Sequence, residues 1–291
     1  TLTLDDTSDT KTGKVTSSEP MSNYHEIHGV CMRGGTFVMN NGEISGNKGG
    51  VGFYSWTDGC TFIMNGGSIT GNTAPQGAGV YVRMATFIMN GGSITGNTAI
   101  YDPDSPGGGN EGGGVFVTYE GHFIMNGGTI SGNTARDGAG LYCEVKFTMN
   151  GGTITGNAST NRGGGVFVNG SGTFVMEDGT ITGNKAAYGG GVFLSTTGSM
   201  TASGTPVVSD NKSNASGSDI TNNVGTVGAR ITLGGELTDG ANIGVSVYQS
   251  SSGVFNWIEP TLTSAVRFTT AEANTSYYAD SSQYFFSDNP N

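Results

Sequence analysis

Apolar and polar residues alternate in short runs that recur along most of the chain. The stretch FIMNGGSITGN at 62–72 returns almost unchanged at 87–97, 123–133, 147–157 and 174–184, with a variant at 37–47 and a degenerate copy at 200–211. The closing asparagines stand at 47, 72, 97, 133, 157, 184 and 211, so successive copies begin 24 to 27 residues apart, with one longer step of 36. A fixed period of this length is typical of a repeat architecture.

Each period contains three strand-like runs: F-x-M, S/T-I-S/T, and a glycine-led run such as Gly79-Val80-Tyr81-Val82. N-G-G, G-N and a variable loop separate them, and glycine and asparagine accept the positive φ of tight turns. Three short strands in about 25 residues fit one coil of a parallel β-helix, whereas a propeller blade needs about 40 residues. We therefore predict an all-β, single-stranded right-handed parallel β-helix over residues 1–248, with its core repeats at 30–211. The non-repeating, aromatic segment 249–291 is predicted to cap its end.

Strand alternation predicts which side chains face the interior. The Phe and Met of F-x-M and the Ile of the second run should point inward, so the Ser and Thr that flank each Ile form an outward hydroxyl array. In the third run the residue two positions after the aromatic is mostly polar, which predicts that the aromatic residue also faces out. These residues form the aromatic row: Tyr54, Tyr81, Phe116, Tyr142, Phe167 and Phe193.

The aromatic row is the candidate binding surface. Together with the neighbouring outward Val and Ile residues, it would exceed the few hundred Å² of continuous apolar surface that monomers usually expose. We expect at least four of its six rings to be accessible to solvent. Such a stripe predicts a glycan, a protein or a second copy of the chain as partner.

Two further rows of asparagines follow the turns and are interpreted as structural. One contains Asn40, Asn65, Asn90, Asn126 and Asn150 and is broken by Glu177; the other contains the closing asparagines of the repeats, with Asn211 as a poorly stacked end. Stacked amides can hydrogen-bond to the coils above and below them.

The step of 36 residues contains an insertion at 101–111. A coil has to close, so the extra residues are expected to bulge outward as a solvated loop. Asp102, Asp104 and Glu111 are candidate calcium ligands there, but their spacing matches no EF-hand loop. No cofactor is predicted.

Composition narrows the classes of function. Glycine accounts for 53 of 291 residues and only 12% are charged, which excludes an ordinary helical domain. The net charge of −11 disfavours nucleic acid as a partner. No apolar run approaches the roughly 20 residues of a membrane span. The chain starts in a strand-like run without a signal peptide, so we expect a piece of a longer protein.

No active site emerges from the pattern. Glycoside hydrolysis needs paired carboxylates, and lyase chemistry needs calcium-binding acids with a base, each on neighbouring coils of one face. The candidate acids are isolated in register: Glu43, Glu144 and the pair Glu177-Asp178. We therefore expect a protein that is not an enzyme.

The F-x-x-N tetrapeptides at 37–40, 62–65, 87–90, 123–126 and 147–150, with their glycine-led partners, resemble repeats of polymorphic outer membrane proteins. That resemblance implies a pectate-lyase-like β-helix in a bacterial adhesin, secreted or exposed on the cell surface. The leading hypothesis is thus a non-catalytic adhesin or stalk segment. Carbohydrate binding or processing through the aromatic row is one alternative, and binding to ice or another crystal surface through the hydroxyl array is a second.

Overall fold

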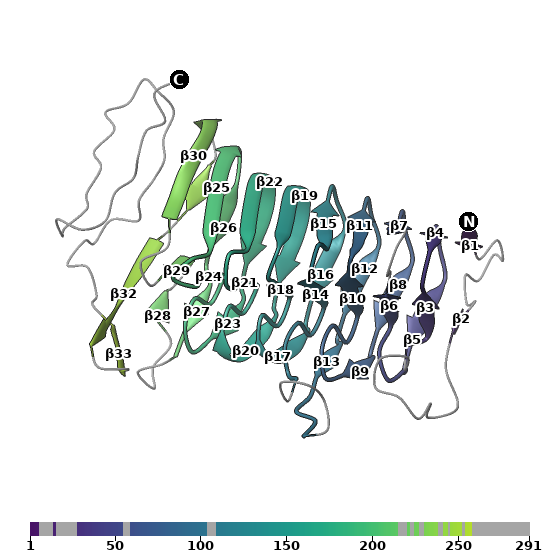
Figure 1. The fold of residues 1–291 in the computed structure, drawn as a ribbon. Coiled ribbons are helices and arrows are strands. Elements are labelled where there is room, and N and C mark those ends of the chain that lie inside the picture. The colour runs from purple at the N-terminus through teal and green to yellow at the C-terminus, as the bar shows by residue number, and fades with distance from the viewer. Residues whose placement is uncertain are drawn as a thin grey trace.

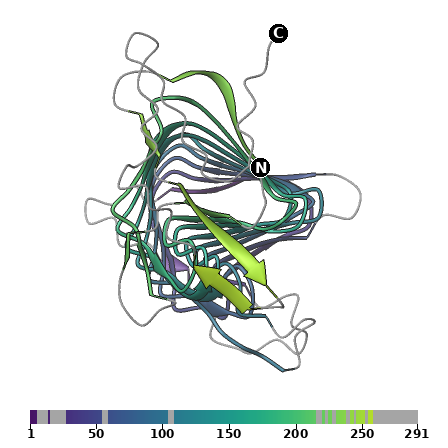
Figure 2. The ribbon, with the colours of Figure 1, turned by 90° about the vertical axis from the view of Figure 1, so that its left-hand side faces the viewer.

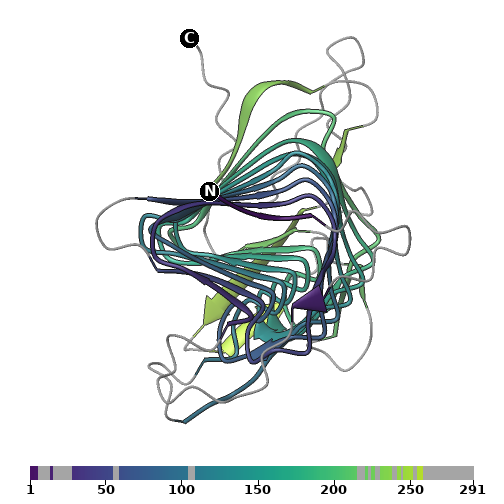
Figure 3. The same ribbon diagram turned by 90° about the vertical axis from the view of Figure 1, so that its right-hand side faces the viewer.

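The structure is a computed structural model that describes residues 1–5, 14–15, 28–54, 59–103, 109–214, 220–221, 224–226, 230–237, 241–243, 245–251 and 254–257. Within these residues the chain is all-β, without a helix, and forms a parallel β-solenoid of about 7 turns with about 26 residues per turn. The turns lie side by side along one axis in Figure 1, and the end-on views show them superposed around a common interior (Figures 2 and 3). The described part therefore holds no helix that could cross a membrane. The predicted fold class is confirmed.

The first two runs of every turn belong to one 16-stranded sheet, here the first sheet. It is continuous because β19 (Lys146–Thr155) and β22 (Thr173–Thr182) each cover both runs. The F-x-M run otherwise forms β1 (Leu2–Leu4), β4 (Gly35–Met39), β7 (Cys60–Met64), β11 (Ala85–Met89), β15 (His122–Met125), β25 (Ser199–Gly204) and β30 (Arg230–Leu237). The second run forms β2 (Lys14–Val15), β5 (Glu43–Ser45), β8 (Ser68–Thr70), β12 (Ser93–Thr95), β16 (Thr129–Ser131), β26 (Val207–Ser209) and β31 (Asn242–Ile243).

The glycine-led run forms the second sheet, and a short strand not separated in the sequence forms the third. The second sheet contains β3 (Val30–Met32), β6 (Val51–Tyr54), β10 (Val80–Arg83), β14 (Val115–Thr118), β18 (Leu141–Cys143), β21 (Val166–Val168), β24 (Val192–Leu194), β29 (Val224–Thr226), β32 (Val245–Ser251) and β33 (Val254–Trp257). The third contains β9 (Thr73–Ala74), β13 (Thr98–Ala99), β17 (Thr134–Asp137), β20 (Ala158–Arg162), β23 (Lys185–Ala186), β27 (Lys212–Ser213) and β28 (Ile220–Thr221). Within the described residues, six turns, from that of β7 and β8 to that of β25 and β26, thus have the three predicted runs and additional strand segments of two to five residues.

Equivalent residues of successive turns pair one to one, which stacks identical side chains. Phe62 pairs with Phe37 and Phe87, and Ile94 pairs with Ile69 and Ile130. The inward Phe rings stack face to face with centroids 4.6–5.0 Å apart. Val80 and Val82 reach the same core from the second sheet. The predicted inward positions of the first sheet are buried, as the alternation indicates.

The closing asparagines form an inner ladder: Asn47, Asn72, Asn97, Asn133, Asn157, Asn184 and Asn211. All are at most 3% exposed. In each step, the Oδ1 atom of one asparagine accepts hydrogen bonds of 2.9–3.0 Å from the backbone N–H and the Nδ2 of the asparagine one turn earlier. The Nδ2 of Asn97 also donates to the Ile69 carbonyl at 3.0 Å. The expectation that Asn211 stacks poorly is wrong, because it is fully buried and accepts both bonds from Asn184.

The second row forms an outer ladder: Asn40, Asn65, Asn90, Asn126 and Asn150. Here the Nδ2 of each asparagine donates to the Oδ1 of the asparagine one turn earlier, at 2.8–2.9 Å. The bonds of the two ladders therefore run in opposite directions along the axis. From Asn65 onward the outer side chains are exposed, and the ladder ends where Glu177 takes the place of an asparagine.

Part of the predicted C-terminal cap lies outside the described residues. The structure describes only 249–251 and 254–257 of the segment 249–291. There β33 pairs with β32 in antiparallel fashion, and β28 pairs with β27 in the same way. The parallel stacking is thus interrupted at this end of the solenoid.

Candidate functional site

The aromatic row lies on the outer face of the second sheet but is not exposed. Tyr81, Phe116, Tyr142, Phe167 and Phe193 form a cluster of their own, separate from the main core that holds Val80 and Val82. The alternation therefore assigned the correct face. Their exposure is only 2–9%, so the expectation of at least four accessible rings is wrong.

The backbone that precedes each strand of the second sheet covers the rings. It folds back over them at a glycine with φ between 56° and 63°: Gly77, Gly112, Gly138, Gly163 and Gly189. A Cβ atom on Gly77 would lie 2.9 Å from the Cβ of Tyr81, so no larger residue fits at this approach. The chain therefore covers its own aromatic row.

The ring faces are also occupied along the axis. Tyr81 and Phe116 stack with centroids 5.4 Å apart and Phe116 and Tyr142 at 4.9 Å, while Phe167 meets Tyr142 edge-on. A sugar would need a free ring face on which to stack. The aromatic row therefore lacks the geometry of the sugar platform that the sequence suggested.

The first position of the row was assigned in the wrong register. Gly52, not Tyr54, pairs with Tyr81, and Tyr54 pairs with Arg83. The ring of His28 occupies the space over Gly52, with its centroid 6.3 Å from that of Tyr81, so a histidine continues the row. Desolvation lowers the pKa of His28 to about 4, which leaves the imidazole neutral at pH 7. The side chain of Tyr54 lies outside the described residues.

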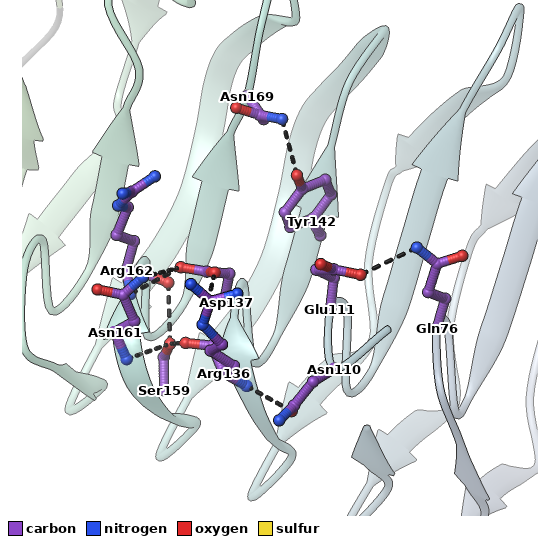
Figure 4. Close-up of polar contacts among 10 residues, drawn as sticks. All are labelled: Gln76, Asn110, Glu111, Arg136, Asp137, Tyr142, Ser159, Asn161, Arg162 and Asn169. Atoms are coloured by element: carbon purple, nitrogen blue, oxygen red, sulfur yellow. Dashed lines mark hydrogen bonds and ion pairs between the residues drawn. The ribbon is translucent and has the colours of Figure 1, made fainter. Parts of the chain in front are cut away.

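A column of polar side chains, the polar column, runs along the covering backbone: Gln76, Glu111, Asp137, Arg162 and Tyr188. Bridges pair these residues from turn to turn. The guanidinium carbon of Arg162 lies 5.8 Å from the ring centroids of both Phe167 and Phe193, and Tyr188 packs against the same cluster. Figure 4 shows the column from Gln76 to Arg162.

The two carboxyl groups of the column are held by neighbouring turns (Figure 4). Glu111 accepts a hydrogen bond of 2.9 Å from Gln76 Nε2. Asp137 is buried; its Oδ1 accepts from Asn161 Nδ2 at 2.9 Å and from the Arg162 backbone N–H at 3.2 Å, and its Oδ2 lies 3.7 Å from Arg136 Nε. These contacts tie Glu111 to the turn before it and Asp137 to the turn after it.

Burial dominates the electrostatics of this region. Desolvation raises the pKa of Asp137, against the lowering effect of Arg136 and Arg162. It also raises the pKa of Glu111, against the hydrogen bond from Gln76. Desolvation likewise raises the pKa of Tyr142, whose hydroxyl accepts a hydrogen bond of 2.7 Å from Asn169. The polar atoms of this arrangement are committed to holding neighbouring turns together.

The insertion contributes differently from expectation. Tyr101 pairs with Gly109 in antiparallel fashion, so these two residues of the insertion lie next to each other, close to the end of β13. Glu111 belongs to the wall of the solenoid, in register with Gln76 and Asp137, and not to the loop. Asp102 is half-buried, and Asp104 lies outside the described residues. Among the residues that the structure places, no group of three or more His, Cys, Asp or Glu side chains could hold a metal ion.

Sequence reasoning missed the polar column because its members share no residue type. The available signal was the glycine after each member, at a constant four residues before the aromatic. No family model, curated protein or solved structure matches this chain.

Proposed function

We propose that this chain is a rigid, non-catalytic segment of a bacterial surface or secreted adhesin, and that it presents the outer face of its first sheet to a glycan or protein. One observation carries the proposal: outward columns on this sheet repeat in register from turn to turn. Ser68, Ser93 and Thr129 form one such column, and Ile63, Ile88 and Ile124 another. All are half-exposed.

The other prominent side chains are committed to the fold, which supports this choice of face. The aromatic row is covered, the inner ladder is buried, and the carboxyl groups of the polar column bind neighbouring turns. A surface that contributes little to stability is free to vary for recognition.

The test is a screen of the whole chain against arrayed glycans and surface proteins. Binding should be lost in a Thr95→Lys variant, which places a charge in the middle of the outward face. It should survive in Ala158→Lys, which adds the same charge at an exposed site of the third sheet. Equal loss in both variants, or release of new reducing ends from a bound glycan, would overturn the proposal.

The hydroxyl array supports a second candidate, binding to an ordered crystal surface such as ice. Each hydroxyl residue of the array pairs with its counterpart in the next turn. The array contains Ser68/Thr70, Ser93/Thr95, Thr129/Ser131, Thr153/Thr155 and Thr180/Thr182. The array repeats roughly every 4.8 Å along the axis and about 6.7 Å along the strand, and it is uncharged. Thermal hysteresis that disappears in Thr155→Lys would favour this candidate over the first.

A further inference from the structure

Four asparagines of the outer ladder are followed directly by glycine: Asn65, Asn90, Asn126 and Asn150. All four side chains are exposed. Asn-Gly is the pair in which the next peptide nitrogen reaches the side-chain carbonyl with least hindrance, because glycine has no Cβ. The outer ladder is therefore a row of chemically labile sites.

The reaction at such a pair is deamidation. The glycine nitrogen forms a bond to Asn Cγ, the Cγ–Nδ2 bond breaks, and ammonia leaves with the proton of the peptide nitrogen. Water then opens the succinimide ring, which leaves aspartate or isoaspartate in place of asparagine.

Hydrogen bonds restrain both reacting groups. The departing Nδ2 of Asn90 donates to Asn65 Oδ1 at 2.9 Å, and that of Asn126 donates to Asn90 Oδ1 at 2.8 Å. The attacking nitrogen is held as well, since Gly91 N–H and Gly127 N–H donate to the Met64 and Met89 carbonyls at 3.2 Å. An asparagine, or rung, of the outer ladder has to break these hydrogen bonds before it can react.

The last rung is held least. Asn150 donates to Asn126 Oδ1 at 2.9 Å, but the next turn carries Glu177 at the ladder position, and within the described residues no donor reaches Asn150 Oδ1. Asn65, Asn90 and Asn126 each have a ladder bond on both sides.

We propose that the outer ladder is a site of spontaneous deamidation that begins at Asn150 and advances turn by turn towards Asn65. Once Asn150 has become an acid, it has no Nδ2 to donate to Asn126, and Asn126 becomes the new last rung. The inner ladder is spared, because its asparagines are buried and none precedes a glycine.

The experiment incubates the folded chain at mildly alkaline pH and follows each asparagine by peptide mapping with mass spectrometry. Asn150 should convert about twofold faster than Asn126, the factor that corresponds to one solvent-exposed hydrogen bond worth a few tenths of a kcal/mol. Glu177→Asn adds a donor beyond Asn150 and should slow it by about the same factor, and its new asparagine precedes Asp178, not glycine. Glu177→Ala removes the charge without adding a donor and should leave Asn150 first.

A pre-converted Asn150→Asp variant gives a second readout, since Asn126 should then react about twofold faster than in the parent chain. Asn41 and Asn169 also precede glycine but lie outside the ladder, and they serve as internal references whose rates should not change. Equal rates at all four rungs, or an Asn150 rate unaffected by Glu177→Asn, would overturn the proposal.

Discussion

The inner and outer ladders are made of the same residue at nearly the same spacing, yet only one of them is continuous. The inner ladder has an asparagine at all seven positions from Asn47 to Asn211, including the degenerate last repeat. The outer ladder gives way to Glu177 while the sheet around it continues through β22 to β25. Stacking amides is therefore not in itself what the fold requires.

The difference lies in what surrounds each amide. An inner asparagine satisfies a buried backbone N–H and a buried isoleucine carbonyl in addition to its ladder partner. An outer asparagine is exposed, so water can replace its partner at little net cost. Burial of the neighbouring backbone groups makes the inner amide indispensable.

The largest effect is expected from a charge in the inner ladder. In Asn97→Asp, the new carboxylate would face the Ile69 carbonyl and Asn133 Oδ1, which are both acceptors. At neutral pH this should cost about 4 kcal/mol of unfolding free energy, as for an uncompensated buried charge. Urea midpoints of the variant and the parent chain measure it.

The same variant should have a characteristic pH dependence. Burial raises the folded-state pKa of the new acid above its unfolded value of about 3.9, so stability falls as pH rises from that value to the folded pKa. The defect relative to the parent chain should therefore shrink near pH 4. Asn90→Asp, in the same turn of the outer ladder, is the control and should lack this recovery.

Asn97→Ala comes next, with an expected loss of about 3 kcal/mol. It removes the acceptor of the Asn72 N–H and Nδ2 groups and the donor to the Ile69 carbonyl, all of which are buried. Chemical denaturation is again the measurement. A loss below about 1 kcal/mol would mean that water enters the ladder, and the contrast with the outer ladder would then fail.

Asn90→Ala should cost about 0.5 kcal/mol or less, because its two ladder bonds are exposed to solvent. Differential scanning calorimetry of this variant beside Asn97→Ala gives a direct comparison within one turn. Similar melting temperatures for the two variants would show that exposure does not distinguish the ladders.

The smallest effect is expected from extending the outer ladder. Glu177→Asn supplies a donor for Asn150 Oδ1 and removes an exposed charge, which should stabilise the fold by a few tenths of a kcal/mol. The urea midpoint should rise slightly. A lower urea midpoint would mean that the Glu177 side chain itself stabilises this turn.

Most of the fold could be predicted from the repeat because equivalent residues of successive turns pair in the same register. The inward Phe and Ile positions, the turn chemistry and the amide rows all follow from one motif and strand alternation. The strands of the third sheet, such as β9 and β13, were not separated because two residues carry no period of their own. The prediction that Tyr54 belongs to the aromatic row was wrong because its turn departs from the consensus. Gly52 stands at the position equivalent to Tyr81, and the ring of His28, from the preceding turn, fills the space over it.

Exposure of the aromatic row could not be read from alternation. Alternation states which side of a strand a residue occupies, and it says nothing about what else packs on that side. Here the cover is the chain just before the strand, and its close approach is marked by glycines such as Gly77 at positive φ. Asp137 and Arg162 escaped notice for a related reason, since they occupy equivalent positions but differ in charge.

Ladder bonds join only neighbouring turns, and this gives the molecule an uneven response to force. If tension on the chain ends peels turns off one after another, each step releases the residues between two inner-ladder asparagines. That number is 24 to 27 for most turns and 36 for the turn with the insertion, between Asn97 and Asn133. At roughly 3.5 Å per extended residue, an ordinary turn releases about 90 Å of chain and the longer one about 125 Å. The turn with the insertion thus gives one longer extension step in an otherwise regular series. In a stretching experiment on a single molecule, this step shows which turn has just come off.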